Sequence, residues 1–202
     1  MEKSEAHLSD GAEDTYWEGF YKSNKSIDRP SQFCDYVLKN YDFSDKRILE
    51  LCSGNGRDSY FLSHFCKKIV AVDKALKPSD GKNLTFVKSE IGSFLQSTEE
   101  TFDLTYCRFG LHSVNRDHQT EILNFSKNIF FEFRSDKDIS YKKDHYRREI
   151  NGNEFLKCLI RHNYEIIYFK ESKGLAILGD QDPMIIRVIA KKKTRENNGW
   201  KF

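Results

Sequence analysis

The sequence has few of the features that mark secreted, membrane-spanning or repetitive proteins. Only 3 of its 202 residues are proline, and no internal repeat or low-complexity linker interrupts it. No stretch approaches the ~20 apolar residues of a spanning helix, and residues 1–10 have no apolar signal-peptide region. We therefore expect neither secretion nor membrane insertion. A chain of this length forms one domain, here expected at residues 13–191 between polar tails at 1–12 and 192–202.

A large excess of charge of one sign is also missing. The 33 Lys and Arg residues nearly balance the 31 Asp and Glu residues, which leaves a net charge of +2. Proteins dedicated to nucleic acid usually carry a strong basic excess. The composition therefore argues against such a role, although the basic run from Lys191 to Arg195 keeps an RNA partner open.

Paired cysteines are absent as well. The 5 cysteines are scattered and include no C-x-x-C pair. An odd, scattered set is typical of free thiols in a reducing compartment, so we predict a cytoplasmic protein. The closest approach to zinc-ligand spacing is His64-x-Cys66, which is not a structural-zinc pattern. We expect no bound metal.

Apolar runs rich in Ile, Val, Phe and Tyr alternate with segments of helix length. This pattern predicts an α/β fold with a mostly parallel sheet and helices on both faces. The strands are expected at residues 47–51, 68–72, 84–87, 102–106, 129–133, 164–170 and 185–190. The helices are expected near 16–21, 33–38, 60–65, 91–96, 116–126 and 153–162. The last two strands are expected to form an antiparallel pair at the sheet edge.

A glycine-containing turn follows the first predicted strand. Residues 50–58 read Glu-Leu-Cys-Ser-Gly-Asn-Gly-Arg-Asp. Gly54 and Gly56 allow close approach of a ligand to the backbone, and the helix that follows offers free N–H groups. A dinucleotide site has the pattern G-x-G-x-x-G with an acidic residue about 20 positions further on. Asp73 fits that pattern, but Ser59 replaces the third glycine.

The same segment resembles motif I of the class I S-adenosylmethionine (SAM)-dependent methyltransferases. In that family an acidic residue on strand one precedes a glycine-rich turn, and a second acidic residue ends strand two. The resemblance implies a single-domain Rossmann-like fold with a seven-stranded, mostly parallel sheet and an antiparallel last strand. It also implies SAM as the cofactor and S-adenosylhomocysteine as its product. The family has a glycine where this chain has Cys52.

The resemblance further implies roles for individual residues. Glu50 is expected to face the methionine amino group, Asp73 to hold the ribose hydroxyls and Glu90 to contact the adenine amine. A carboxylate suits a diol because it accepts two hydrogen bonds at once. The complete set of expected cofactor residues is Trp17, Tyr21, Glu50, Cys52, Ser53, Gly54, Asn55, Gly56, Asp58, Asp73, Lys74, Glu90, Ile91 and Cys107.

An aromatic segment at residues 16–21 precedes the turn. Trp17 and Tyr21 are predicted to form a lid that excludes water from the cofactor. The alternative is that aromatic residues at this spacing simply face the core. Related enzymes keep a similar Tyr-Trp-x-x-Phe-Tyr element ahead of motif I, so residues 13–40 are expected to be an N-terminal helical lid.

The second half of the sequence bears on the methyl acceptor. No Asn-Pro-Pro-Tyr type of signature follows the fourth strand, which argues against methylation of adenine or glutamine nitrogen. The segments 108–113, 131–138, 145–148 and 182–183 are similar to small bacterial methyltransferases associated with surface-glycan gene clusters. The similarity extends over residues 14–191. It implies O-methylation of a small anionic acceptor such as a sugar phosphate, a nucleotide-linked sugar or a phosphate-derived capsule precursor.

Four arginines are predicted to bind that acceptor, because guanidinium groups match phosphate and carboxylate oxygens. They are Arg108, Arg134, Arg147 and Arg148. For the last two, the alternative is a solvated, mixed-charge helix face over residues 142–149.

Three side chains are candidates for a general base. His112 ranks first because it follows the fourth strand, and His145 is the second histidine, since neutral imidazole titrates near physiological pH. Either histidine can instead be structural. Glu132 is the third candidate, with a structural alternative of holding Arg134 or Arg108. An ionised phosphate oxygen needs no base, and a non-catalytic scaffold is a further alternative because fold does not establish function.

Overall fold

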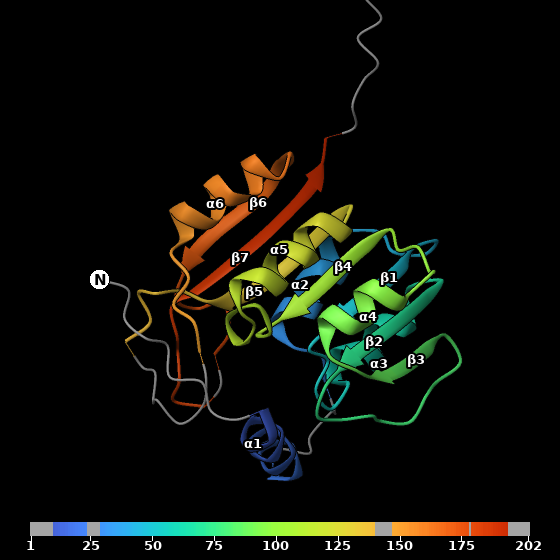
Figure 1. Cartoon of the computed structure of the whole chain (residues 1–202). Helices are drawn as coiled ribbons and strands as arrows, with labels where there is room; N and C mark the ends of the chain where they lie inside the picture. The colour runs from blue at the N-terminus through green and yellow to red at the C-terminus, as the bar shows by residue number, and fades with distance from the viewer. Residues whose placement is uncertain (1–9, 24–28, 140–146, 178, 194–202) are drawn as a thin grey trace, which may run out of the picture.

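The computed structural model describes residues 10–23, 29–139, 147–177 and 179–193 (Figure 1). Its strands are β1 (Arg47–Leu51), β2 (Lys68–Asp73), β3 (Leu84–Lys88), β4 (Leu104–Arg108), β5 (Asn128–Arg134), β6 (Tyr164–Ser172) and β7 (Ile185–Lys192). Its α-helices are α1 (Asp10–Ser23), α2 (Gln32–Asn40), α3 (Arg57–Ser63), α4 (Ile91–Ser97), α5 (Arg116–Phe125) and α6 (Gly152–Arg161), with a 3-10 turn, η1, at Leu111–Ser113.

The strands form one seven-stranded sheet in the order β3-β2-β1-β4-β5-β7-β6. The first five of these strands are parallel, whereas β7 runs antiparallel to both β5 and β6. The predicted α/β class and the antiparallel last strand are confirmed. Because the parallel strands share a direction, the segments that follow them meet along one edge of the sheet, where open α/β folds bind ligands.

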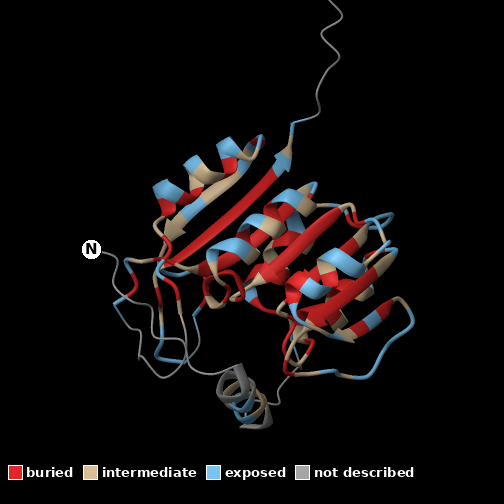
Figure 2. Ribbon diagram, viewed as in Figure 1, coloured by how far each residue is buried: buried red, intermediate tan, exposed pale blue. Residues whose placement is uncertain are grey.

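Apolar residues cover both faces of the sheet, as expected for parallel strands buried on two sides. One core cluster includes residues of α4, α5 and α6, and the other includes residues of α2 and α3. Figure 2 shows the central strands buried between these helical layers, whose outer surfaces are exposed. Helix α1 lies apart from both layers in Figure 1, near the carboxyl edge of the sheet.

Three expectations about the elements need correction. β4 begins at Leu104, two residues later than predicted, because Asp103 uses its side chain to accept a hydrogen bond from the Arg47 N–H (2.7 Å). α3 ends at Ser63, so Phe65 lies outside the helix and is 55% exposed instead of packing on the sheet. α1 begins at Asp10, inside the stretch expected to be a tail.

The predicted lid of residues 13–40 divides into two different structures. Phe33, Cys34 and Val37 of α2 are fully buried in the core. Ser31 caps this helix by accepting a hydrogen bond from the Cys34 N–H (3.0 Å). α2 is therefore part of the folded core, and only α1 is placed where a lid over the carboxyl edge would lie.

Candidate functional site

The turn after β1 has a backbone that favours glycine. Gly54 and Gly56 have φ values of 56° and 77°, and Cys52, where the resembling family has glycine, has φ of 57°. A Cβ on Gly54 would lie 2.2 Å from the Tyr21 hydroxyl oxygen, and one on Gly56 would lie 2.4 Å from Phe86 Cζ. Both positive φ values favour glycine, and a Cβ at either position would also displace the end of an aromatic side chain.

Most backbone donors of this turn are bonded within the protein. The N–H groups of Ser53 and Gly56 donate to the carbonyl oxygens of Val72 (3.2 Å) and Ser53 (3.0 Å), and the Arg57 N–H at the start of α3 donates to Asn55 Oδ1 (3.3 Å). The Ser53 hydroxyl is buried and has no hydrogen-bond partner among the described residues. A buried hydroxyl without a partner is costly, and it fits a turn that completes its hydrogen bonds with a ligand.

Asp73, at the end of β2, organises the turn. Its Oδ2 accepts a hydrogen bond from the Gly54 N–H (2.8 Å), and its Oδ1 accepts from the N–H groups of Ala75 (2.9 Å) and Leu76 (3.1 Å). A carboxylate oxygen can accept two hydrogen bonds, so acceptor capacity for a ribose hydroxyl is left mainly on Oδ2. Lys74 follows Asp73 and is half-buried.

Glu50 lies beneath the turn. It is 3% exposed and its Oε2 accepts a hydrogen bond from the Ser59 hydroxyl (2.6 Å). Burial, and then the charge of Asp58, raise its pKa well above the ordinary carboxyl range. A cationic ligand group would relieve this penalty. Ser59, which replaces the third glycine of a dinucleotide pattern, thus uses its hydroxyl to bind Glu50.

Tyr21 is the residue of α1 that contacts the turn. Burial raises its pKa, and the neighbouring Asp73 adds to the effect. Trp17 packs against it, with ring centroids 6.2 Å apart, and Glu18 approaches Lys88 at the end of β3 (3.9 Å). These contacts place Tyr21 at the turn and Trp17 beside Tyr21 on the same helix.

The remaining expected cofactor residues differ in placement. Glu90 is exposed at the start of α4, whereas Ile91 is buried in the core. Asn55 accepts a hydrogen bond from the Arg57 N–H (3.3 Å), and Cys107 is buried beneath the turn.

Asp58 requires a correction, because its carboxylate serves the fold. It accepts hydrogen bonds from the Ser31 N–H (2.8 Å), the Ser31 hydroxyl (2.6 Å) and the Tyr106 hydroxyl (2.8 Å). Burial opposes its ionisation, but Arg108, Arg57 and the bonds from Ser31 outweigh burial and lower its pKa. Asp58 therefore joins α2, α3 and β4 and is not aimed at a cofactor.

The ends of β4 and β5 contain a buried ion cluster. Glu132 is fully buried; Arg108 Nε donates to its Oε1 (3.0 Å), and Arg187 donates to its Oε2 through Nε (2.9 Å) and Nη2 (2.6 Å). Burial raises the pKa of Glu132, and the two arginines oppose that shift. This geometry supports the structural role of Glu132, which is to hold Arg108, and not the role of general base.

Sequence reasoning missed Arg187 and Phe109. The only signal for Arg187 is a charged residue inside the apolar run 185–190. Phe109 follows β4 with φ of 57°, an uncommon conformation for a bulky residue. Its ring lies 4.1 Å from the guanidinium carbon of Arg108 and 5.7 Å from that of Arg134.

His112 lies on η1 beside the end of β5. It is 4% exposed, and its Nδ1 accepts a hydrogen bond from the Arg134 N–H (3.3 Å). Its carbonyl oxygen accepts from the Arg148 N–H (2.7 Å). The structure thus places His112 directly after β4 as expected, and its role as a base stays a prediction. His145 lies outside the described residues.

The other predicted acceptor-binding arginines also bond within the protein. Arg134 Nη1 (2.7 Å) and Arg147 Nη2 (3.1 Å) both donate to Asp138 Oδ2. Arg148 is 8% exposed and donates to the carbonyl oxygens of Val114 and Leu111 and to Gln119. Residues 147–150 form no helix. The alternative of a solvated helix face is therefore wrong for Arg147 and Arg148.

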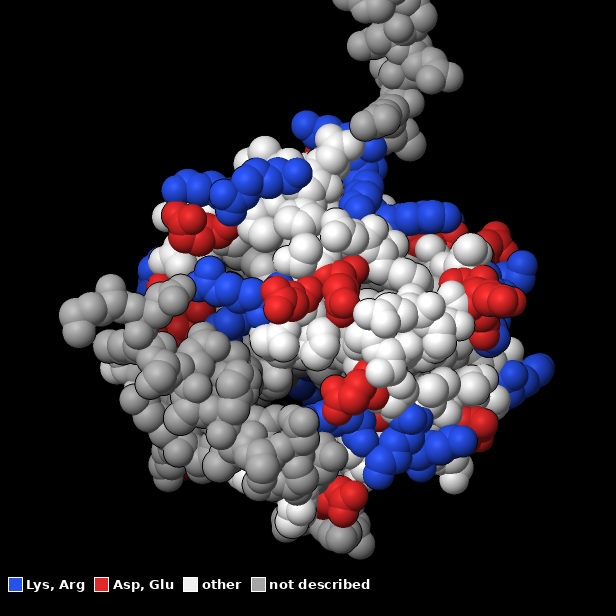
Figure 3. Space-filling model, in the orientation of Figure 1, with Lys and Arg blue, Asp and Glu red and all other residues white. Residues whose placement is uncertain are grey.

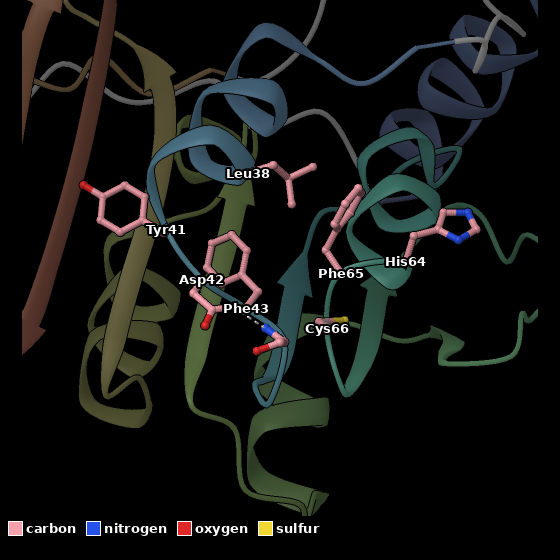
Figure 4. A pocket seen from close by; sticks show the side chains of 8 residues that line it. Leu38, Tyr41, Asp42, Phe43, His64, Phe65 and Cys66 are labelled. Atoms are coloured by element: carbon pink, nitrogen blue, oxygen red, sulfur yellow. Dashed lines mark hydrogen bonds between the residues drawn. The ribbon is translucent and has the colours of Figure 1, made fainter.

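A separate cavity of about 370 Å³ lies at the opposite edge of the sheet, near the starts of β1 and β2 (Figure 4). In Figure 4 the side chains of Leu38 and Phe65 point toward each other, whereas His64 and Tyr41 point outward on opposite sides. Burial raises the pKa of Cys66, another lining residue, to about 11. None of the expected cofactor residues lines this cavity.

The described surface and interior provide three further findings. On the face shown in Figure 3, Lys and Arg side chains are interspersed with Asp and Glu instead of forming a field of one sign. Among the residues with described placement, no three His, Cys, Asp or Glu side chains gather as a metal site requires. No helix within the described ranges is both long and apolar enough to cross a bilayer.

Comparison with known proteins relates this geometry to other molecules. No protein-family model matches the chain, and no curated protein matches it in sequence. Solved structures do match in fold. A SAM-dependent methyltransferase from Anabaena variabilis superimposes with a TM-score of 0.67 at 15% identity, covering 93% of this chain and all of the other.

Two further structures show how widely the fold is used. A SAM-dependent methyltransferase from Archaeoglobus fulgidus gives a TM-score of 0.64 at 18% identity over 88% of this chain and 100% of its own. The [4+2]-cyclase SpnF gives 0.62 at 12% identity over 81% and 80%. The chain therefore has the Rossmann-like fold of the class I methyltransferases, a fold that also occurs in a cyclase.

Proposed function

We propose that this protein is a SAM-dependent methyltransferase. The observation that carries the proposal is the turn at residues 52–56, where positive-φ backbone, the partnerless Ser53 hydroxyl and the Asp73 carboxylate meet under Tyr21. These groups fit the polar ends of SAM. Glu50 and the turn would hold its methionine part, Asp73 its ribose and Glu90 its adenine.

Two features favour SAM over a dinucleotide. Ser59 is fully buried and donates to Glu50, in place of the third glycine of a dinucleotide turn. In addition, β7 is antiparallel within the sheet, whereas the dinucleotide-binding fold has six parallel strands in the order 3-2-1-4-5-6.

SAM supplies an electrophilic methyl group when bound, and its transfer is an in-line displacement. The protein contributes mainly by positioning the acceptor and excluding water. Tyr21 and Trp17 on α1 would close the site, and the residues after β4 would position the acceptor. His112 would remove the proton of a hydroxyl acceptor through Nδ1, which requires Nδ1 to release its hydrogen bond from the Arg134 N–H. An ionised phosphate oxygen would need no base.

We infer that the acceptor is a small anion methylated on oxygen. Arg108 and Arg187 share the single carboxylate of Glu132, and Arg134 and Arg147 share that of Asp138. The ends of β4 and β5 thus bring four guanidinium groups together. A sugar phosphate, a nucleotide-linked sugar or a phosphate-derived capsule precursor has the matching charge.

The test is transfer of a labelled methyl group from SAM to matched acceptors. We expect methylation of phosphorylated or nucleotide-linked sugars and none of the same sugars without phosphate. Arg108→Met should raise KM for the acceptor about tenfold, consistent with loss of one charge-assisted hydrogen bond. Arg161→Met, on the far end of α6, is the matched control and should leave KM unchanged.

Other outcomes would favour the alternatives. Equal methylation of neutral sugars would contradict the anionic acceptor. Methylation of RNA with steep salt dependence would favour a nucleic-acid substrate. Tight SAM binding without transfer to any acceptor class would support a non-catalytic role.

A further inference from the structure

Two cysteines lie next to each other at the base of the candidate cofactor turn. Leu51 at the end of β1 is paired with Cys107 of β4, and Cys52 directly follows Leu51. The hydrogen bond between the two thiols, together with burial, raises the pKa of Cys52 well above its ordinary value. The turn therefore rests on a thiol pair contributed by two neighbouring strands.

Gly110 shows how closely the two sulfur atoms approach. A Cβ atom on Gly110 would lie 2.5 Å from Cys52 Sγ and 2.7 Å from Cys107 Sγ. These two distances place the sulfurs no more than about 5.2 Å apart, with the loop after β4 packed directly on them. The Cys52 and Cys107 thiols are free in the structure.

The backbone spacing suits a covalent link. Neighbouring strands lie about 4.8 Å apart, and disulfides join Cα atoms about 4.4–6.8 Å apart. Cys52 is one residue beyond the partner of Cys107, so its Cα lies diagonally across this gap. Closing the pair leaves the strand ladder in place, because the ladder ends at Leu51, and moves Cys52 in the turn beyond it.

We propose that Cys52 and Cys107 form a reversible disulfide that switches the turn between a cofactor-binding and a non-binding form. The switch rests on the proposed function, because it acts on the same turn. An S–S bond is about 2.05 Å long, shorter than the contact between two hydrogen-bonded thiols. Cys52 must therefore shift toward Cys107 and move Ser53 and Gly54 with it.

A peroxide can supply the oxidation. Cys52 is half-buried and Cys107 is buried, so Cys52 reacts first. Because its pKa is raised, only a small fraction of Cys52 is thiolate, and the reaction is correspondingly slow. That thiolate attacks one peroxide oxygen, the O–O bond breaks, and a sulfenic acid and one water form. The sulfur of Cys107 then attacks Cys52 Sγ; the S–O bond breaks, the S–S bond forms, and a second water leaves. The two cysteines lose two electrons, and the peroxide gains both.

Thermodynamic linkage gives the switch a second consequence. If the disulfide weakens cofactor binding by some factor, the bound cofactor must oppose disulfide formation by the same factor. S-adenosylhomocysteine should therefore protect the pair from oxidation.

The experiment compares the wild type with Cys107→Ala and with Cys158→Ala. Cys158 lies on α6, away from the turn, and is half-buried like Cys52. Each protein is treated with hydrogen peroxide, its remaining thiols are alkylated, and its peptides are mapped by mass spectrometry. S-adenosylhomocysteine is then titrated into the reduced and oxidised forms.

We expect a Cys52–Cys107 peptide from the wild type and from Cys158→Ala, and none from Cys107→Ala. Oxidation should weaken S-adenosylhomocysteine binding by at least about tenfold in the first two proteins, and dithiothreitol should restore it. Saturation with S-adenosylhomocysteine should lower the equilibrium constant for disulfide formation by the same factor. Cys52→Gly, which restores the residue that suits φ of 57°, should make binding insensitive to peroxide.

Two results would overturn the switch: Cys52 and Cys107 still alkylated after Cys158 has been oxidised, or a disulfide that leaves the affinity unchanged. If the reduced wild type binds no S-adenosylhomocysteine, the proposed function fails and the switch fails with it. In that case the peptide map still decides whether the two cysteines pair.

Discussion

The two halves of the sheet's carboxyl edge use their polar groups in different ways. At the end of β1, the turn leaves the Ser53 hydroxyl without a partner among the described residues. At the ends of β4 and β5, the charged side chains bind one another, as Glu132 does with Arg108 and Arg187. The first half thus has a polar group left for a ligand, whereas the second is a preformed ionic framework.

This difference indicates where specificity resides. A turn whose geometry depends on glycine and one carboxylate can bind a common cofactor in many proteins. A buried cluster such as Glu132 with its two arginines fixes the direction of Arg108 and, through the Phe109 N–H that donates to the Glu132 carbonyl oxygen (2.7 Å), the backbone beside it. We predict that preorganised polar groups of this kind determine which acceptor fits.

The largest expected effect is on stability, and it comes from a substitution in the ion cluster at the ends of β4 and β5. Glu132→Gln removes the charge that compensates Arg108 and Arg187, and breaking a buried ion pair costs about 3–5 kcal/mol. The unfolding free energy in urea should fall by that amount. Glu165→Gln is the matched control, because Glu165 pairs with Lys191 across the neighbouring β6 and β7 while both side chains are about half exposed; it should cost less than about 1 kcal/mol.

Equal losses in the two variants would show that the Glu132 cluster is no more than a surface pair in energetic terms. The contrast between the two halves would then disappear.

The next largest effect is on ligand binding, and it comes from a substitution at the turn after β1. Asp73→Ala removes the acceptor of the Gly54 N–H and the expected partner of the ribose. Loss of charged hydrogen bonds of about 1.5–3 kcal/mol should weaken S-adenosylhomocysteine binding by about 100-fold, measured by calorimetry. Asp35→Ala, exposed on α2, is the control and should bind normally. Unchanged affinity in Asp73→Ala would contradict the assigned site.

A smaller effect is the pH dependence of stability that Glu50, beneath the turn, should cause. Burial and Asp58 raise the pKa of Glu50 above its ordinary value of 4.5. As pH rises, the unfolded chain releases this proton before the folded chain does, so Glu50 reduces stability from about pH 4.5 upward. Glu50→Gln should therefore have a higher Tm than the wild type at pH 8, by about 2–4 °C for each kcal/mol recovered.

The Tm difference between Glu50→Gln and the wild type should vanish near pH 4, where the protonated Glu50 side chain is neutral, as the Gln side chain is. A constant difference across this pH range would show that Glu50 does not titrate as its burial requires.

Local sequence determined the features that were predicted correctly. The limits of β1 match the expectation because Arg47–Leu51 is a short apolar run that ends at a turn signal. The turn residues and Asp73 come together because two adjacent parallel strands must end at the same edge. Neither inference requires knowledge of distant contacts.

The missed features depend on partners far away in the sequence. Arg187 reaches Glu132 across 55 positions, and Asp58 reaches Tyr106 across 48. A carboxylate near a glycine turn has the same sequence signal whether it faces a ligand or a tyrosine. Arg148 was ambiguous for the same reason, because its partner Gln119 lies 29 positions away. Arg147 pairs with Asp138 only 9 positions away, but a run of charged residues does not show that contact.

Calorimetric titration of the reduced protein with SAM, S-adenosylhomocysteine and NAD, performed in parallel, tests the central claim most directly, because it requires no knowledge of the acceptor. Micromolar binding of the first two ligands, corresponding to about −8 kcal/mol, and no binding of NAD is the predicted result. Binding of NAD alone, or of none of the three, would contradict the assignment of the turn to SAM.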